Sequence, residues 1–391
     1  MLFMKNLLLP VFLAVLGPTA VYADVIPASK EACEVAIPSV LNDVTWFENN
    51  KLTINQMLML CSDLNGIQLL LDKTIDYAKQ HETTHELTTL DAIRHADKTL
   101  HGAPYDQNRL GKVNGSYVPG FKDFYIAGSE IKLAKQTFDL MQAPITAHND
   151  KKDTVQDFWD TVVVMRKSPI IVTTHDPKEK IPIKGYAQRA EYWTHDRFTP
   201  YMKLRSGWKL YRQGDDELLL TSRYANGIQL VKREFVAKHK ESKQEHLITQ
   251  FHYQGWPDRL GAADHELLVT ALKAVDEECK KKNLHPNTPI TVHCAAGMGR
   301  SPTFCASNYL RRELLEALEK NTSKEEIRID FAGTIYQFMK ARPGVLQTIE
   351  HWQCILFALR RTYLEHMGVA NEEIRLLENE VEATTHARAA A

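Results

Sequence analysis

The stretch TVHCAAGMGRSPTF, residues 291–304, decides the fold of this chain because it lies between a short apolar strand and the start of a helix. Cys294 and Arg300 stand six positions apart in it, and Gly297 and Gly299 lie between them. Two glycines allow a tight loop whose backbone N–H groups converge on one point. The positive end of the following helix is directed to the same point. The loop is therefore predicted to cradle a phosphoryl dianion.

Cys294 is the predicted nucleophile of this cradle. In such a field a thiol loses its proton well below its free pKa of about 8.5. Arg300 can offer two parallel N–H donors to two phosphoryl oxygens, which the point charge of a lysine cannot match. Ser301 is placed to donate a hydrogen bond to the sulfur when it leaves in a second step. The alternative is that Cys294 is an ordinary buried cysteine at a strand end.

A second segment, QFHYQGWPDRL at residues 250–260, supplies a candidate acid. Residues 247–253 alternate between two faces, which predicts a strand, and Gly255 and Pro257 predict a loop after it. Expelling an alkoxide or phenolate from phosphorus requires a proton, and Asp258 on a loop that closes over the phosphate can deliver it. The alternative for Asp258 is a turn aspartate.

A third segment, RPGVLQTIEHWQCILFAL at residues 342–359, places Gln347 just ahead of an amphipathic helix. A neutral amide there can orient the water that hydrolyses a cysteinyl phosphate. The alternative for Gln347 is a solvated residue near a helix start.

These three segments resemble the tyrosine-specific protein phosphatases with a cysteine nucleophile, and they follow that family's order along the chain. The resemblance extends over roughly residues 85–365. Further matching stretches are FKDFYIAGS (121–129), QAPI and TVQDFW between 142 and 159, SPIIVTT (168–174), AEYW (190–193) and KREFV (232–236).

The resemblance implies an α/β (α+β) fold of the tyrosine phosphatase type, with a twisted, mixed central sheet flanked by helices. We expect the cradle at the carboxyl end of the strand Ile290–His293. The implied roles are Cys294 as nucleophile, Arg300 as phosphate clamp, Asp258 as acid and then base, and Gln347 as the residue that positions water. The resemblance also implies that Tyr192 hydrogen-bonds His293 and so helps to set the acidity of the thiol.

The substrate-binding set that follows is Ala295, Ala296, Gly297, Met298, Gly299, Arg300, Leu110 and Trp256. No metal or cofactor is implied, since the arginine and the backbone donors replace one. The expected partners are phosphotyrosyl proteins, host proteins among them.

The chain also departs from the family pattern at several positions. Leu110 stands where a tyrosine usually stacks on the phosphotyrosine ring, and Lys112 replaces an aspartate that fixes the substrate backbone. Pro302 lies in the cradle where glycine is common, no proline soon follows the acid loop, and His351 replaces the second glutamine of the water-positioning loop.

These departures leave three functions open: hydrolysis of phosphotyrosine in proteins, hydrolysis of an inositol polyphosphate in the same cradle, and an inactive phosphotyrosine-binding module. Leu110 and Lys112 favour the inositol phosphate. Ala295, Ala296 and Met298 speak against it, because a site for many phosphates should carry lysines or arginines there.

Composition excludes some other classes of function. The 391 residues are 44% hydrophobic and carry a formal net charge of −1, which gives no electrostatic case for nucleic acid. The 16 histidines show no metal-binding spacing.

The two ends of the chain lie outside the resemblance. Residues 1–23 are predicted to be a signal peptide, because Lys5 precedes an apolar run and small residues end the segment; the alternative is an uncleaved membrane anchor. A signal peptide implies that the protein is exported to the periplasm or the medium and is not associated with the membrane after cleavage. Such export favours a bacterial-type member of the family.

Residues 24–84 are predicted to be a helical extension packed on the catalytic domain, or alternatively a binding appendage, with Thr53 or Ser62 as helix caps. Residues 366–391 are predicted to form an acidic helix and a tail.

The remaining cysteines divide into two groups. Cys279, Cys305 and Cys354 lie in apolar helical patterns and are predicted to be core residues. Cys33 and Cys61 lie in the N-terminal region, and the sequence leaves open whether they form a disulfide.

Overall fold

In this computed structural model, the structure describes residues 51–80, 112–113, 116–117, 128–144, 154–177, 190–193, 200–223, 227–258, 260–262, 264–320, 323–342, 344–346 and 348–379. Leu110, Gln347, Cys33 and the predicted signal segment 1–23 lie outside the described residues.

An eight-stranded sheet organises the fold, in the order β4-β5-β11-β6-β10-β9-β8-β7. Its strands are β4 (Gly128–Leu133), β5 (Gln136–Gln142), β6 (Ile170–Thr173), β7 (Met202–Lys203), β8 (Trp208–Thr221), β9 (Gln229–His239), β10 (Glu245–Gln254) and β11 (Pro289–Cys294). The four central strands pair in parallel, and the outer ones pair antiparallel. The predicted mixed sheet is confirmed, and the parallel strands bring their carboxyl ends to one edge. A short hairpin, β2 (Lys112–Val113) and β3 (Ser116–Tyr117), stands apart from this sheet.

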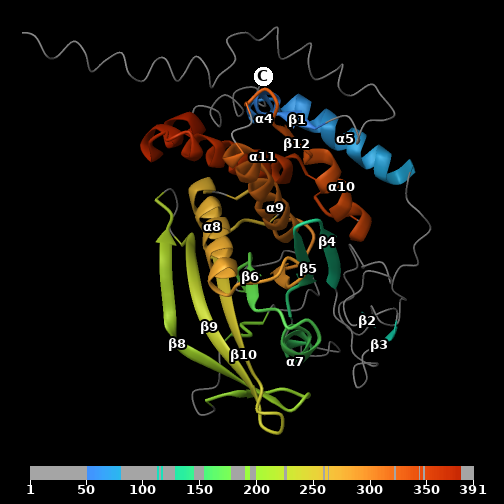
Figure 1. Ribbon diagram of the computed structural model, residues 1–391, viewed down its shortest axis with the longest axis vertical. Coiled ribbons are helices and arrows are strands. Elements are labelled where there is room, and N and C mark those ends of the chain that lie inside the picture. The colour runs from blue at the N-terminus through green and yellow to red at the C-terminus, as the bar shows by residue number, and fades with distance from the viewer. Residues whose placement is uncertain are drawn as a thin grey trace, which may run out of the picture.

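Helices cover both faces of the sheet. The helices of the larger layer are α8 (His265–Lys281), α9 (Arg300–Glu319), α10 (Phe331–Ala341) and α11 (Ile349–His366). Figure 1 shows these four gathered on one side of the molecule, with α7 (Val155–Asp160) apart from them. α7 continues directly into a π-helical turn, η2 (Thr161–Met165).

Alternating side chains divide the interior into two cores. On β6, Ile170 and Val172 join the core beneath α8 to α11, whereas Ile171 joins a second core with Phe158 and Val162 of α7 and η2. Because successive residues of a strand point to opposite faces, a strand buried on both faces must be continuously apolar. The run of apolar residues in β6 is therefore explained by its central place in the sheet.

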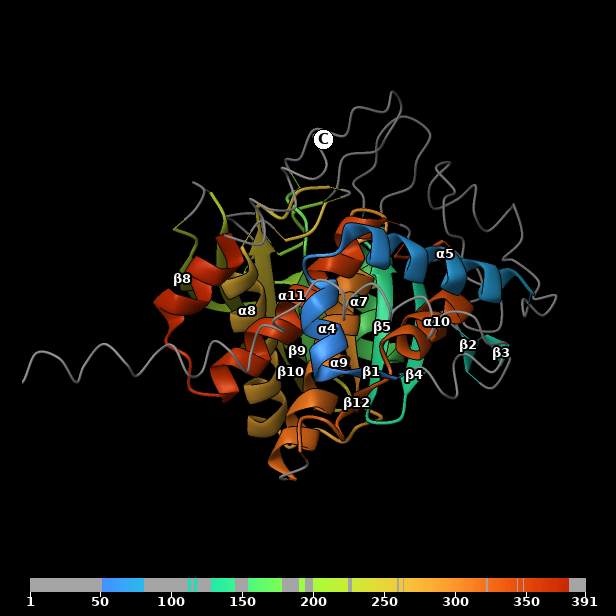
Figure 2. The ribbon, with the colours of Figure 1, turned by 90° about the horizontal axis from the view of Figure 1, so that it is seen from above.

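The described part of the predicted N-terminal extension, residues 51–80, packs on the catalytic domain. Its helices α4 (Ile54–Leu60) and α5 (Leu64–Gln80) share a core with α10 and α11, and β1 (Leu52–Thr53) pairs with β12 (Arg328–Ile329). Figure 2 shows α5 lying across this side of the molecule. Thr53 caps α4 with a reciprocal bond to Gln56, as predicted. Ser62 is not the second cap, because the Asp63 carboxylate accepts the Gly66 N–H at the start of α5.

Buried ion pairs attach the C-terminal helix, residues 371–379, to the domain. The Arg361 side chain is fully buried, and its Nη1 lies 2.7 Å from Glu378 Oε2. Arg375 Nη2 lies 2.7 Å from Glu266 Oε2 on α8. Removing one partner from such a pair leaves a buried charge without compensation, so these contacts fix where the helix docks.

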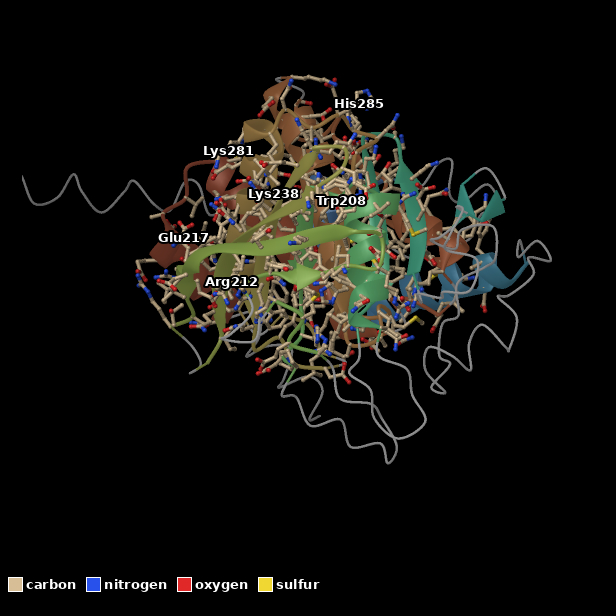
Figure 3. The ribbon with its side chains drawn as sticks, turned by 90° about the horizontal axis from the view of Figure 1, so that it is seen from below. Trp208, Arg212, Glu217, Lys238, Lys281 and His285 are labelled. Carbon is tan, nitrogen blue, oxygen red and sulfur yellow. The ribbon has the colours of Figure 1, made fainter. Side chains whose placement is uncertain are left out.

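The outer strands carry charges on their exposed face. Figure 3 shows Arg212 and Glu217 along β8 and Lys238 on neighbouring β9. Lys238 Nζ pairs with Glu245 Oε1 at 2.7 Å across the β9–β10 hairpin. Charged side chains of this kind oppose association of exposed sheet edges with other chains.

The packing of α5 predicts that the extension unfolds together with the domain. Ile67→Ala removes a fully buried side chain and should lower the free energy of unfolding by about 2–5 kcal/mol in urea titrations. Leu69→Ala, on the same helix but 38% exposed, is the matched control and should change it by about 0.5 kcal/mol or less. Equal small effects from both variants would show that the extension is an independent appendage.

Candidate active site

The loop between β11 and α9 forms the predicted cradle at the carboxyl edge of the parallel strands. β11 ends at Cys294 and α9 begins at Arg300, so the loop is held by a strand on one side and a helix on the other. Gly297 has φ +71°, and a Cβ atom there would lie 2.6 Å from the Met141 carbonyl oxygen of β5. Both the conformation and the close approach therefore require glycine at this position.

Bonds from neighbouring segments hold the outward-facing carbonyls of the cradle. Arg342 Nη2 donates to the Ala296 carbonyl at 3.1 Å, and the Leu346 N–H donates to the Met298 carbonyl at 3.1 Å. On the inner side, the Gly297 N–H donates to Cys294 Sγ at 3.1 Å. The loop thus presents an amide to the sulfur while its carbonyls are occupied elsewhere, which is the polarity that an anion site requires.

The charge balance at Cys294 differs from that of the other described thiols. Burial of Cys294 raises its pKa, but the Arg300 charge, the nearby Ser301 hydroxyl and the backbone N–H groups of Ser301 and Met298 lower it by more, so the pKa lies below its ordinary value. The Ser301 hydroxyl is near enough to favour the thiolate, although it makes no hydrogen bond of ordinary geometry in the structure.

Burial without such compensation has the opposite effect. It raises the pKa of Cys61, Cys279 and Cys354 to about 12, and that of Cys305 well above its usual range. Cys305 and Cys354 are core residues as predicted, and Cys279 is partly buried. Cys61 is a free, buried thiol, and Cys33 lies outside the described residues.

Arg300 connects the cradle to the loop that carries the predicted acid. Its Nη1 donates to the Trp256 carbonyl at 2.9 Å, and its Nη2 lies 3.1 Å from Asp258 Oδ1. The Arg300 side chain is 1% exposed, whereas that of Asp258 is 52% exposed. The structure therefore brings Asp258 and Trp256 to the cradle, with the carboxyl group directed toward accessible space.

A buried hydrogen-bond network supports the residue before the nucleophile. Tyr192 Oη lies 2.5 Å from His293 Nε2, as the resemblance implied. The same phenol oxygen lies 2.8 Å from Thr173 Oγ1 and accepts a bond from Gln250 Nε2 at 2.8 Å. β6, β10 and β11 each contribute one residue to this network, so it ties the three parallel strands together behind Cys294.

Most of the predicted site residues lie at the cradle. Ala295, Ala296, Gly297, Met298 and Gly299 form the loop, and Ser301 is buried in the first turn of α9. Leu110 and Gln347 are outside the described residues, so their predicted roles are not tested here.

Sequence reasoning missed three residues that contact the cradle: Arg342, Leu346 and His351. All three belong to the segment that was chosen for Gln347. The departure from the family at His351 was visible in the sequence, but its contact with Gly299 was not. Within the described ranges, no group of three or more histidine, cysteine or acidic residues is placed to hold a metal ion.

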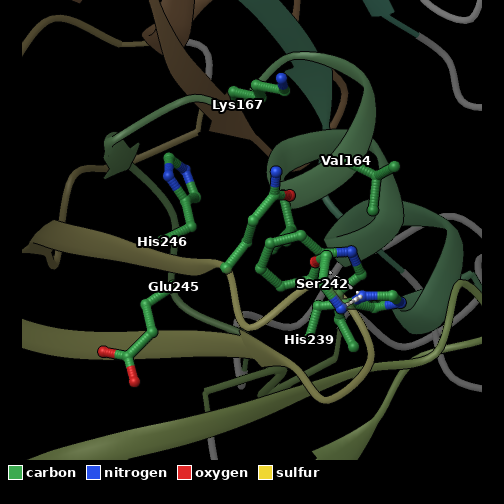
Figure 4. Close-up of a pocket in the computed structure, with 9 residues that line it drawn as sticks. Val164, Lys167, His239, Ser242, Glu245 and His246 are labelled. Atoms are coloured by element: carbon green, nitrogen blue, oxygen red, sulfur yellow. Dashed lines mark hydrogen bonds between the residues drawn. The ribbon is translucent and has the colours of Figure 1, made fainter.

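A cavity lies at the end of β10 opposite to the acid loop. It has a volume of about 540 Å³ and lies near the start of β10, between Val164, Trp208, His239 and His246. Figure 4 shows His239 bonded to Ser242 on one side of it and His246 on the other. Neither a cysteine nor any residue of the cradle lines this cavity, so the cradle is the candidate active site.

The geometry is that of a phosphate-binding loop built around an acidic cysteine. A model of the protein-tyrosine phosphatase family matches residues 95–360, and the chain belongs to this family. The crystal structure of a Trypanosoma cruzi protein tyrosine phosphatase matches with a TM-score of 0.55 at 20% identity, covering 77% of this chain and 93% of that one. That likeness supports the fold.

Curated relatives agree with the family. Mouse receptor-type tyrosine-protein phosphatase eta is 27% identical over 271 residues, which cover 66% of this chain and 18% of the relative. Human receptor-type tyrosine-protein phosphatase alpha is 26% identical over 271 residues, covering 66% of this chain and 28% of the relative. The chain thus spans less than a third of the length of these relatives, and the helices at residues 51–80 precede the family match.

The contact between Ser301 and the sulfur predicts a change in thiol reactivity. Ser301→Ala should raise the pKa of Cys294, because the hydroxyl favours the thiolate. The rate of Cys294 alkylation by iodoacetamide at pH 6 should therefore fall several-fold. Ser307→Ala removes another buried hydroxyl from α9 and is the control. An unchanged pH profile of alkylation in Ser301→Ala would contradict the prediction.

Proposed function

We propose that this chain hydrolyses phosphotyrosine in proteins through a cysteinyl-phosphate intermediate. The observation that carries the proposal is the geometry of the cradle: the Gly297 N–H donates to the buried sulfur of Cys294, and Arg300 contacts both Trp256 and Asp258 of the acid loop. The Arg300 charge also lowers the pKa of Cys294, which favours the thiolate. Family membership supports the same activity.

In the first step, the Cys294 thiolate attacks phosphorus and the bond to the leaving oxygen breaks. Arg300 and the inward amides of the cradle bind the phosphoryl oxygens, where they stabilise the charge of the transition state. Asp258 donates its proton to the leaving oxygen, which makes a tyrosine phenol a competent leaving group. This step needs a thiolate and a protonated carboxyl group at the same time.

In the second step, water attacks phosphorus and the sulfur leaves as a thiolate. The Asp258 carboxylate accepts the proton from this water, reversing its first role. The interactions that keep the pKa of Cys294 low also make its sulfur a better leaving group. Gln347 is proposed to position the water.

The substrate class is argued from the loop. The side chains of Ala295, Ala296 and Met298 add no positive charge beyond Arg300, which suits a single phosphoryl group. Leu110 and Lys112 favour the second candidate, an inositol polyphosphate. The two substrates can be compared directly.

The decisive experiment measures phosphate release by the reduced protein from a phosphotyrosyl peptide and from inositol hexakisphosphate. We expect release mainly from the peptide. Release mainly from the inositol phosphate would transfer the proposal to the second candidate, and binding of the peptide without release would identify an inactive binding module.

Two variants test whether the residues of the cradle and the acid loop catalyse this release of phosphate. Cys294→Ser should lower turnover at least about a thousandfold, whereas Cys279→Ser, a cysteine away from the cradle, should retain it. Asp258→Asn should lower turnover about a hundredfold or more, and Asp215→Asn on exposed β8 is its control. Turnover that survives Cys294→Ser would reject the covalent mechanism.

Export is proposed on the sequence of residues 1–23 alone. Among the described helices, none combines the length and the apolar character of a transmembrane span. Expression in a Gram-negative bacterium should give a periplasmic or extracellular protein whose N-terminus, determined by mass spectrometry, is Asp24. An intact Met1 on protein that remains in the cytoplasm would reject export.

A further inference from the structure

His351 lies directly against the cradle, although it belongs to a different part of the chain. It is in the first turn of α11 and is 4% exposed. A Cβ atom placed on Gly299 would come within 2.5 Å of His351 Nε2 and 2.7 Å of Cε1. The Nε2 edge of the imidazole therefore contacts the backbone of the residue that precedes Arg300.

The two ring nitrogens of His351 have different surroundings. Nδ1 lies 2.9 Å from Thr348 Oγ1. Nε2 is buried and has no hydrogen-bond partner among the described residues. An unpaired buried polar atom is unfavourable and needs a physical explanation, most simply a ligand or a water that it binds.

The charged groups around the ring belong to the catalytic machinery. Arg300 and Asp258 both act on its pKa, together with Glu350 on its own helix. Burial lowers the pKa of His351 to about 4, and the Arg300 charge lowers it as well. At neutral pH the ring is uncharged, and Nε2 carries a lone pair when Nδ1–H donates to Thr348.

α11 also contacts the end of the acid loop. The Ala262 N–H donates to Cys354 Sγ at 3.3 Å, and a Cβ atom on Gly261 would lie 3.0 Å from the Glu350 carbonyl oxygen. The first turn of α11 is therefore packed against both the acid loop and the cradle. The His351 side chain on this turn is therefore held between the acid loop and the cradle.

We propose that His351 Nε2 accepts a hydrogen bond from the water that hydrolyses the cysteinyl phosphate, and so orients its oxygen toward phosphorus. This inference rests on the proposed function. In the step, the water oxygen bonds to phosphorus, the S–P bond breaks, and its electron pair returns to Cys294 Sγ. One water proton passes to the Asp258 carboxylate, and the other leaves with the phosphate. His351 gains no proton in the cycle.

An imidazole differs from an amide in this position. A glutamine keeps an accepting oxygen at every pH, whereas a protonated imidazole loses its acceptor and places a cation beside Arg300. The second step should therefore weaken as the pH falls toward the pKa of His351.

The test separates the two chemical steps with p-nitrophenyl phosphate in rapid-mixing experiments. kcat/KM reports events up to release of the phenolate, and kcat includes hydrolysis of the intermediate. His351→Ala should lower kcat about tenfold, leave kcat/KM within about twofold, and produce a burst of nitrophenolate with trapped phosphocysteine. His351→Gln should recover most of kcat. In its pH profile, the fall of kcat near pH 4 that comes from protonation of the imidazole should be absent.

His265→Ala is the matched control, because His265 is also buried and contacts Phe357 of α11 but does not face the cradle. It should produce no burst. The inference is overturned if His351→Ala lowers kcat and kcat/KM equally, changes neither, or behaves as His265→Ala does. If the wild-type protein releases no phosphate, the proposed function fails, and the inference fails with it.

Discussion

The interaction between Arg300 and Cys294 opposes the cost of burying a thiolate, and the site depends on it. Four other described cysteines show what burial does alone, since the pKa of each is raised. Cys294 is buried as they are, yet its pKa is lowered. The difference requires a buried guanidinium beside the sulfur, and such a charge is tolerated only where it is itself paired and hydrogen-bonded.

The backbone of the cradle supplies that placement. A strand that ends at Cys294 and a helix that begins at Arg300 fix the two ends of the loop, and Gly297 permits its approach to β5. The outward carbonyls would remain unsatisfied if Arg342 and Leu346 did not bond to them. Leu346 adopts φ 54°, which is strained for a bulky residue, and its full burial shows that packing enforces this conformation. The segment before α11 thus helps to hold the cradle in shape.

Local patterns were sufficient to predict the parts of the site that are continuous in sequence. The spacing of Cys294 and Arg300 and the alternation before Trp256 identified β11, β10 and their loops, because each signal lies within a few residues. Contacts between distant segments were not predictable in this way. Nothing in the residues around Arg342 and His351 indicates that these side chains contact the cradle, because the contacts join segments about 50 positions apart. The start of α5 was also not predicted correctly, because neighbouring residues can both serve as caps and the structure uses Asp63 instead of Ser62.

The pairing of Arg300 with Asp258 has a consequence for the order of events. Arg300 Nη1 bonds to the Trp256 carbonyl, and Nη2 to the Asp258 carboxyl group. A phosphoryl oxygen bound by Nη2 must compete with Asp258, and it competes more easily when Asp258 is protonated, because a neutral carboxyl group attracts a guanidinium less strongly. In the proposed mechanism, the first step uses the protonated form of Asp258. Binding of a phosphoryl dianion at Arg300 and protonation of the acid therefore favour each other, while the Trp256 contact can persist and hold the loop at the cradle.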